Sequence, residues 1–194
     1  MSRPPSVRQT RPVPPKEPPA PLVPWTERYR LELGALRGRR ISRVLYEGLD
    51  RDADGPWDRG DWHHVEQCVW FLLEDEVFSV GWRTFTEPVA LVLEQMPGVD
   101  PLAGVGGADG ARWEVTGHPR WAPWVGQELV TVDAIWRRSE VAGYDEVPVA
   151  VRLGIRGGVL WIAAASDQLR VGVDEVVVAF SSAIANRLGV GRLD

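Results

Sequence analysis

The sequence predicts a mainly β fold, made of two similar antiparallel β-units that are related by an internal duplication, with one or two short helices. One order of pieces occurs twice: a glycine, a strand, a polar loop, and two apolar strands joined by a turn. The pieces of the first copy are Gly38, Ile41, Val44, residues 69–73 and residues 77–81. Those of the second copy are Gly126, Leu129, Val132, residues 151–155 and residues 159–163. Repeated units share a core because one unit alone cannot bury its apolar face.

Composition restricts the class of protein. The chain has 194 residues, enough for one core or for two small units that share one. Its formal net charge of −5 argues against a general nucleic-acid binder, because such domains carry a basic surface that neutralises phosphates. Cys68 is the single cysteine, so no intramolecular disulfide can form and we expect a cytoplasmic protein. The chain has neither the apolar run of a signal peptide nor that of a membrane helix, so we expect no membrane association.

Four segments are predicted along the chain. Residues 1–24 contain nine prolines and little to bury, so we expect an extended, disordered tail. A Pro-x-x-Pro spacing at residues 12–15 offers an alternative, because it suits a polyproline ligand. The first β-unit is expected at 25–96, a glycine-rich connector at 97–118, and the second β-unit, ending in a short helix, at 119–194. We expect the two units to form one compact domain.

A short helix is expected directly after the tail. Thr26 can cap its N-terminus. Its apolar face would contain Tyr29, Leu33 and Leu36, which recur at helical spacing. Gly38 is expected to end this helix, because glycine readily adopts the left-handed conformation found after many helices.

Two central strands show the alternation of a strand with one buried face. In the first, one face carries Val65, Val69, Phe71 and Leu73, and the other carries His64, Glu66, Cys68 and Trp70. In the second, one face carries Val149, Val151, Leu153 and Ile155, and the other carries Arg152 and Arg156. Gly157 and Gly158 follow, and we expect them to form the positive-φ turn of a two-residue hairpin.

Each unit is expected to close with a further strand. These strands are predicted at residues 88–94 and 173–180. After the second one, Ser181 or Ser182 can cap a short helix that Gly189 ends.

The loop from Asp50 to Asp61 is the sharpest candidate site. Its oxygen-bearing side chains occupy positions 1, 3, 5, 9 and 12, with Gly55 at position 6, which is the spacing of an EF-hand calcium loop. These side chains are Asp50, Asp52, Asp54, Asp58 and Asp61. Position 12 lacks the usual glutamate and the flanks look like strands, so the alternative is a solvated acidic loop. No other cofactor is predicted.

A zinc or catalytic site would require the histidines to converge with a carboxylate or with Cys68. The histidines of the chain are His63, His64 and His118. His63 and His64 are adjacent in a strand and point to opposite faces, which disfavours joint ligation. Cys68 has no candidate base at a recognisable spacing, so we interpret it as a packing residue. No motif of a known catalytic class occurs, and no catalytic residue is predicted.

Several tryptophans lie in or beside predicted loops with arginine nearby. Tryptophan and arginine are enriched at binding hot spots, and they attract each other through cation–π contacts. The predicted partner-binding residues are Trp57, Trp62, Trp121, Trp124, Trp136 and Arg137. The alternative is that these tryptophans close the open ends of a small β-domain.

These features predict a non-enzymatic binding or accessory protein, such as an immunity-type or assembly factor, that engages a protein partner through its tryptophan- and arginine-rich loops. The alternative function is a small-ligand-binding domain, or an enzyme of unfamiliar type, that uses the groove between the two β-units. Its candidate residues would be Asp50, Asp52, Asp54 and His64.

Overall fold

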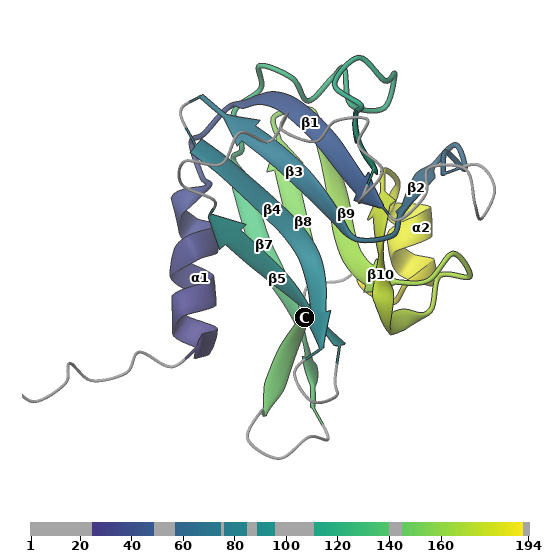
Figure 1. The fold of residues 1–194 in the computed structure, drawn as a ribbon. Helices are drawn as coiled ribbons and strands as arrows, with labels where there is room; N and C mark the ends of the chain where they lie inside the picture. Colours follow the sequence, from purple (N-terminus) through teal and green to yellow (C-terminus); the bar gives the residue numbers. More distant parts are fainter. Residues whose placement is uncertain are drawn as a thin grey trace, which may run out of the picture.

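The computed structural model describes residues 25–48, 57–74, 76–84, 89–95, 111–139 and 145–191. They form two antiparallel five-stranded sheets packed face to face, with two short helices (Figure 1). The mainly β fold predicted from the sequence is therefore confirmed. Neither of the described helices is long and apolar enough to cross a membrane.

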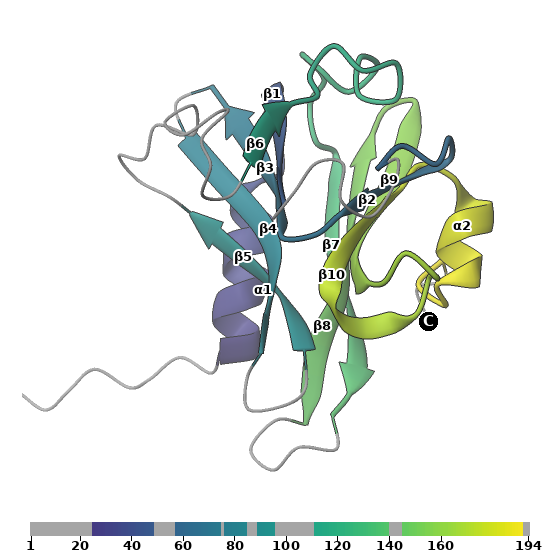
Figure 2. The same ribbon diagram turned by 45° about the vertical axis from the view of Figure 1, so that its right-hand side comes forward.

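Each sheet contains a meander of four strands and one additional edge strand. The first sheet contains, in spatial order, β5 (Val89–Gln95), β4 (Glu76–Thr84), β3 (Cys68–Leu73), β1 (Ile41–Gly48) and β6 (Ala111–Glu114). The second contains β2 (Trp62–Val65), β10 (Val171–Ala179), β9 (Gly158–Ala165), β8 (Glu146–Ile155) and β7 (Thr131–Arg138). The additional strands cross the predicted boundaries, because β2 lies in the first predicted unit and pairs with β10, whereas β6 lies in the predicted connector and pairs with β1 (Figure 2).

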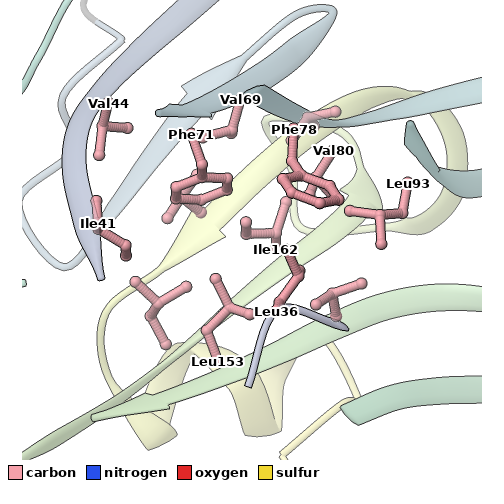
Figure 3. Close-up of a cluster of buried hydrophobic side chains, with 14 of the residues drawn as sticks. Leu36, Ile41, Val44, Val69, Phe71, Phe78, Val80, Leu93, Leu153 and Ile162 are labelled. Carbon is pink, nitrogen blue, oxygen red and sulfur yellow. The ribbon is translucent and has the colours of Figure 1, made fainter. Parts of the chain in front are cut away.

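Side chains from the inner faces of both sheets form one common core (Figure 3). Val44 and Phe71 come from the first sheet, Leu153 and Ile162 come from the second, and all four are buried. The strand alternation places these residues on the inner face. The two sheets therefore depend on the same core for their stability.

The two helices cover different parts of the sandwich. The predicted apolar face of α1 (Trp25–Ala35) is buried: Tyr29 and Leu33 lie on the helix, and Leu36 directly follows its last residue. α2 (Ser182–Arg187) lies on the outer face of the second sheet, over a second apolar cluster that includes Trp161 and Val177. Ser181 caps α2 as predicted, since its side chain accepts the backbone N–H of Ile184 at 3.4 Å. Gly189, with φ of 70°, follows this helix.

The two meanders have the same strand order and matching register. Phe71 in β3 pairs with Val44 in β1, and Leu153 in β8 pairs with Val132 in β7. These are the positions that the sequence repeat treats as equivalent. The internal duplication itself stays a prediction, because equal order and register do not show that the two backbones superpose.

The predicted hairpin after residue 155 is confirmed, but its turn is different from the predicted one. Ile155 pairs with Gly158, so the two turn residues are Arg156 and Gly157. Neither Gly157 nor Gly158 has a left-handed φ. The positive-φ prediction is therefore wrong.

Two predictions about strand continuity also need correction. The strand expected through Val65 and Val69 is divided, because β2 ends at Val65 and β3 begins at Cys68 in the other sheet. Val149 belongs to the outer cluster beneath α2 rather than to the common core that contains Val151. The register of β7 against β8 shifts between Ile135 and Trp136, opposite this part of β8, and such irregularities re-aim side chains.

Candidate functional site

Asp58, His63 and His118 bring one carboxylate and two imidazoles together beside β2. Their candidate ligand atoms all lie within 4.8 Å of one another. His63 is fully buried, whereas the side chains of Asp58 and His118 are 41% and 20% exposed. The cluster therefore extends from the core to the surface. We call it the Asp58–His63–His118 cluster.

A tight turn places Asp58 beside His63. It is closed by the backbone N–H of His64, which donates to the Trp57 carbonyl at 2.8 Å. Gly60 has a φ of 84°, which glycine adopts without steric cost. The Gly60 N–H donates to Asp58 Oδ1 at 2.7 Å. This bond orients the carboxylate within its own turn.

His118 reaches the cluster from the chain between β6 and β7. Its Nδ1 accepts the backbone N–H of Arg120 at 3.3 Å, so the proton of the neutral ring lies on Nε2. Nε2 then donates to Asp58 Oδ2 at 3.1 Å. The Arg120 side chain donates to the Gly60 carbonyl at 2.8 Å and pairs with Asp61. Arg120 thus joins the two segments that carry the cluster.

Tyr46 and Trp121 hold His63 from the core side. Trp121 Nε1 donates to Tyr46 Oη at 2.6 Å, and Tyr46 Oη lies 2.6 Å from His63 Nδ1. Because the indole N–H can only donate, the Tyr46 hydroxyl directs its own proton toward His63 Nδ1. The neutral imidazole of His63 therefore carries its proton on Nε2, and this atom has no hydrogen-bond partner.

The protonation states follow from burial and from these bonds. Burial lowers the pKa of His63 to about 3, with help from the nearby His118, so its ring is neutral at pH 7. Burial by itself raises the pKa of Asp58. The hydrogen bonds from Gly60 and His118 outweigh this effect, so its pKa lies below the ordinary value. At neutral pH the cluster therefore contains a carboxylate and a neutral His63 imidazole.

Aromatic rings surround the two imidazoles. The ring centroid of Trp57 lies 4.8 Å from that of His63 and 5.3 Å from that of His118. Phe180 packs against His63 at 4.7 Å. These rings exclude water from the inner side of the cluster and strengthen its electrostatic interactions.

The structure separates the residues predicted for metal binding. Asp58 lies in the cluster, and Asp61 pairs with Arg120. Three of the predicted calcium ligands lie outside the described residues: Asp50, Asp52 and Asp54. His64 points away from His63, as predicted, and its Nε2 lies 3.1 Å from the Glu175 carboxylate. The adjacent His63 and His64 therefore do not share a site, as expected from the strand alternation. The histidine that lies beside His63 is His118.

The predicted partner-binding tryptophans have different environments. Trp121 and Trp124 are buried in the common core, so they add almost no exposed area to a partner surface. For these two residues the prediction is corrected, and they close the core instead. Trp57, Trp62 and Trp136 are half-buried, and Arg137 is exposed.

Trp136 and α1 line a groove of about 310 Å³ at the edge of the second sheet. Arg30 lies over the Trp136 ring, with its guanidinium carbon 5.1 Å from the ring centroid. Arg37 donates to the carbonyl of Val132 at 3.1 Å and to the Asp133 carboxylate at 3.0 Å. The groove therefore combines an aromatic floor with two arginines.

A second hollow, of about 300 Å³, lies on the outer face of the first sheet. Its polar centre is Glu47, which accepts the Trp70 indole N–H at 2.6 Å and pairs with Arg112 at 3.1 Å. Cys68 lies 3.4 Å from the same carboxylate. Burial, together with Glu47, raises the pKa of the Cys68 thiol well above its usual value. Cys68 therefore remains a thiol at neutral pH, which supports its interpretation as a packing residue.

Comparisons with protein-family models, with curated proteins and with solved structures found no match. Functional arguments for this chain therefore depend on its own residues. Of these residues, Tyr46 had no role in the sequence interpretation, and Arg120 entered it only as one of the arginines near a loop tryptophan. Tyr46 belongs to an apolar strand pattern, and Arg120 is one arginine among many, so neither carried a signal that would have distinguished it.

Proposed function

We propose that this protein is a non-enzymatic binding or accessory protein, and that it engages another macromolecule at the groove between α1 and β7. The observation that carries this proposal is the half-buried Trp136, which lies under Arg30 in that groove. Tryptophan and arginine are the residue types most enriched at binding hot spots. A ring that is already held by Arg30 and by Tyr29, at 5.6 Å between centroids, loses little conformational freedom on binding.

The surroundings of the groove support the same proposal. β7 is an edge strand, and β8 is its one partner among the described strands. An edge strand offers backbone groups to which an extended segment of a partner can add. Among the residues that the structure describes, two large apolar side chains are exposed, Leu31 on α1 at 65% and Val130 just before β7 at 52%. Both lie on the elements that form the groove or lead into it.

Charge suggests the chemistry of the partner. Arg30 and Arg37 line the groove, and Asp133, which pairs with Arg37, is the one acidic residue of the lining. On a chain with a net charge of −5, this local excess of arginine favours an acidic partner segment. The alternative, a ligand in the groove between the two β-units, gains no support, because the described residues between the sheets form a packed core.

The test is affinity capture from the native host with the full chain and two double variants. Arg30→Glu/Trp136→Ala removes the proposed contact. Arg59→Glu/Trp62→Ala is the matched control, because Arg59 lies over the Trp62 ring at 5.9 Å away from the groove. We expect a partner that binds the wild type and the control, is lost from the Arg30/Trp136 variant, and binds more weakly at high salt.

Equal capture by both double variants would contradict the proposed location of the site. The absence of any specific partner of the wild type would contradict the proposed function. Far-UV circular dichroism of each variant shows whether a loss of capture reflects unfolding.

A further inference from the structure

The buried nitrogen of His63 is the starting point. His63 has no exposed surface, and its Nε2 lacks a hydrogen-bond partner although it faces the Asp58 carboxylate at 3.6 Å. Leaving a buried polar group unpaired is unfavourable, because the group has lost its hydrogen bonds to water. A group that binds this nitrogen would remove the cost. The position of Asp58 and His118 around it indicates which kind of group fits.

The three side chains supply the donors of a transition-metal site. Two imidazoles and one carboxylate form a set that suits Zn²⁺ and neighbouring divalent ions. Two ligand atoms at about 2.1 Å from a tetrahedral ion lie roughly 3.4 Å apart. Asp58 Oδ1 lies 3.6 Å from His63 Nε2, and Asp58 Oδ2 lies 3.1 Å from His118 Nε2. The three candidate ligand atoms lie within 4.8 Å of one another, so closing the site requires a small turn of the carboxylate and a small approach of the side chains.

The neighbours of the three side chains orient them as the outer contacts of a metal site do. Tyr46 Oη lies 2.6 Å from His63 Nδ1, and the Gly60 N–H donates a hydrogen bond to Asp58 Oδ1. Ligating histidines usually donate their second ring nitrogen to a fixed partner, and such partners tune metal affinity. Arg120 joins the segments that carry Asp58 and His118, so the donors are held together before an ion binds.

We propose that Asp58, His63 and His118 bind one divalent transition-metal ion, with Zn²⁺ as the ion to be used as the probe. Each imidazole coordinates through Nε2 and keeps one proton, which moves to Nδ1. His63 Nδ1 then donates to Tyr46 Oη, so the Tyr46 hydroxyl has to turn its own proton away from the ring. The 3.3 Å contact between the Arg120 N–H and His118 Nδ1 also has to open, and these two changes are the local cost of binding.

Three protein ligands leave at least one position for water or for another ligand. The exposure of Asp58 and His118 places that position on the solvent side of the cluster, opposite the buried His63. The cluster lies beside β2 and is distinct from the groove between α1 and β7 (Figure 1). Metal binding is therefore independent of the proposed function and can be tested by itself.

The experiment is an isothermal titration of Zn²⁺ into the full chain after removal of metal with EDTA, with Co²⁺ absorption as a readout of coordination geometry. His118→Ala removes a ligand whose side chain is partly exposed, so we expect it to fold. Asp58→Asn is a second ligand variant of almost unchanged size. The matched control is His64→Ala, because His64 is the one histidine of the chain outside the cluster.

We expect the wild type and His64→Ala to bind one Zn²⁺ per chain with similar Kd. His118→Ala and Asp58→Asn should weaken binding by more than the roughly 100-fold that the loss of an outer partner costs. Tyr46→Phe, which removes a positioning residue, should weaken it by about 10–100-fold while the Co²⁺ spectrum keeps its shape.

Three results would overturn the proposal. The first is a wild-type chain that binds neither Zn²⁺ nor Co²⁺. The second is an unchanged Zn²⁺ affinity in both ligand variants, which would place the ion elsewhere. The third is a preference for Ca²⁺ over Zn²⁺, which would favour the acidic loop of the sequence prediction. Circular dichroism of each variant identifies unfolding. If His118→Ala does not fold, the Zn²⁺ affinity of Asp58→Asn tests the proposal.

Discussion

Arg40 and Glu128 lie opposite each other in an isolated antiparallel bridge between the segments that lead into β1 and β7. Their side chains also face each other at 3.7 Å, but both are about half exposed, so this ion pair adds little stability. The bridge is important because of its backbone, which joins the first strand of one sheet to the first meander strand of the other.

Four backbone hydrogen bonds surround this bridge in two reciprocal pairs. Gly38 donates to Leu129 at 2.9 Å, and Gly126 donates to Ile41 at 2.7 Å. In the second pair, Leu129 donates to Arg39 at 2.9 Å, and Ile41 donates to Gln127 at 3.4 Å. The sequence repeat matches Gly38 with Gly126 and Ile41 with Leu129. A pseudo-twofold axis between Arg40 and Glu128 would produce this reciprocal pattern, and it gives the predicted duplication a specific test.

Gly38→Ala and Gly126→Ala should destabilise the protein to a similar extent. Both glycines have a left-handed φ, 80° and 76°, and open space where a Cβ would lie. The cost is therefore conformational, about 1–2 kcal/mol each. Urea denaturation of the two variants measures it. If the stability losses of the two variants differ by more than this range, the two glycines do not have equivalent roles at the bridge.

Gly34→Ala should instead stabilise the protein. Gly34 lies in the last turn of α1 and has no left-handed φ. A Cβ added there would meet no atom within 4 Å. Alanine favours a helix interior by about 0.8–1.0 kcal/mol over glycine, and we expect up to this gain in the last turn. An increase in melting temperature is the expected readout, and this variant serves as the control for the two turn glycines.

Phe71→Ala and Leu153→Ala should each lower the free energy of unfolding by about 2–5 kcal/mol, because both leave a cavity in the common core. Phe71 is 3% exposed and Leu153 is 1% exposed. Arg152→Ala is the control. Arg152 is partly exposed and its pair with Asp133 is long, 3.8 Å, so its loss should cost under about 1 kcal/mol. A larger loss for Arg152→Ala than for Leu153→Ala would contradict the register of β8.

Trp121→Phe should destabilise the protein more than Trp82→Phe does. Each substitution removes an indole N–H bond, at 2.6 Å to Tyr46 Oη and at 2.8 Å to the Glu66 carbonyl. Trp121 is fully buried, so water cannot replace its bond, and the loss should reach about 1–3 kcal/mol. Trp82 is partly exposed, and water can replace its bond. Chemical denaturation of the two variants compares these costs, and equal losses would contradict this assignment.

Cys68 should react slowly with a thiol reagent such as DTNB at pH 8. Burial and the nearby Glu47 raise the pKa of the thiol, so the reactive thiolate is scarcer than in an ordinary cysteine at every pH below that pKa. The rate should rise as the pH increases beyond 9. Glu47→Gln removes one of the two causes and should speed the reaction. A rate at pH 8 equal to that of the urea-unfolded chain would contradict this environment.

Local patterns were sufficient for most elements of the fold. The apolar face of α1, the cap at Ser181, and the alternation in β3 and in β8 from Val151 onward depend on neighbouring residues, and the structure contains them. The turn after Ile155 was less predictable. A turn at Arg156 and Gly157 and a turn at Gly157 and Gly158 fit nearly the same sequence pattern. The division between β2 and β3 was also missed, since Val65 and Val69 are both buried although they belong to different sheets.

The sequence by itself determined that this protein is mainly β and that His63 and His64 face apart. These properties follow from alternation and turn chemistry, which act over a few residues. Only the tertiary structure decided that His118 meets His63 and Asp58, and that Trp136 but not Trp121 lines a surface groove. Such contacts join segments far apart in the chain, and they depend on how the two sheets share one core, which no local pattern specifies.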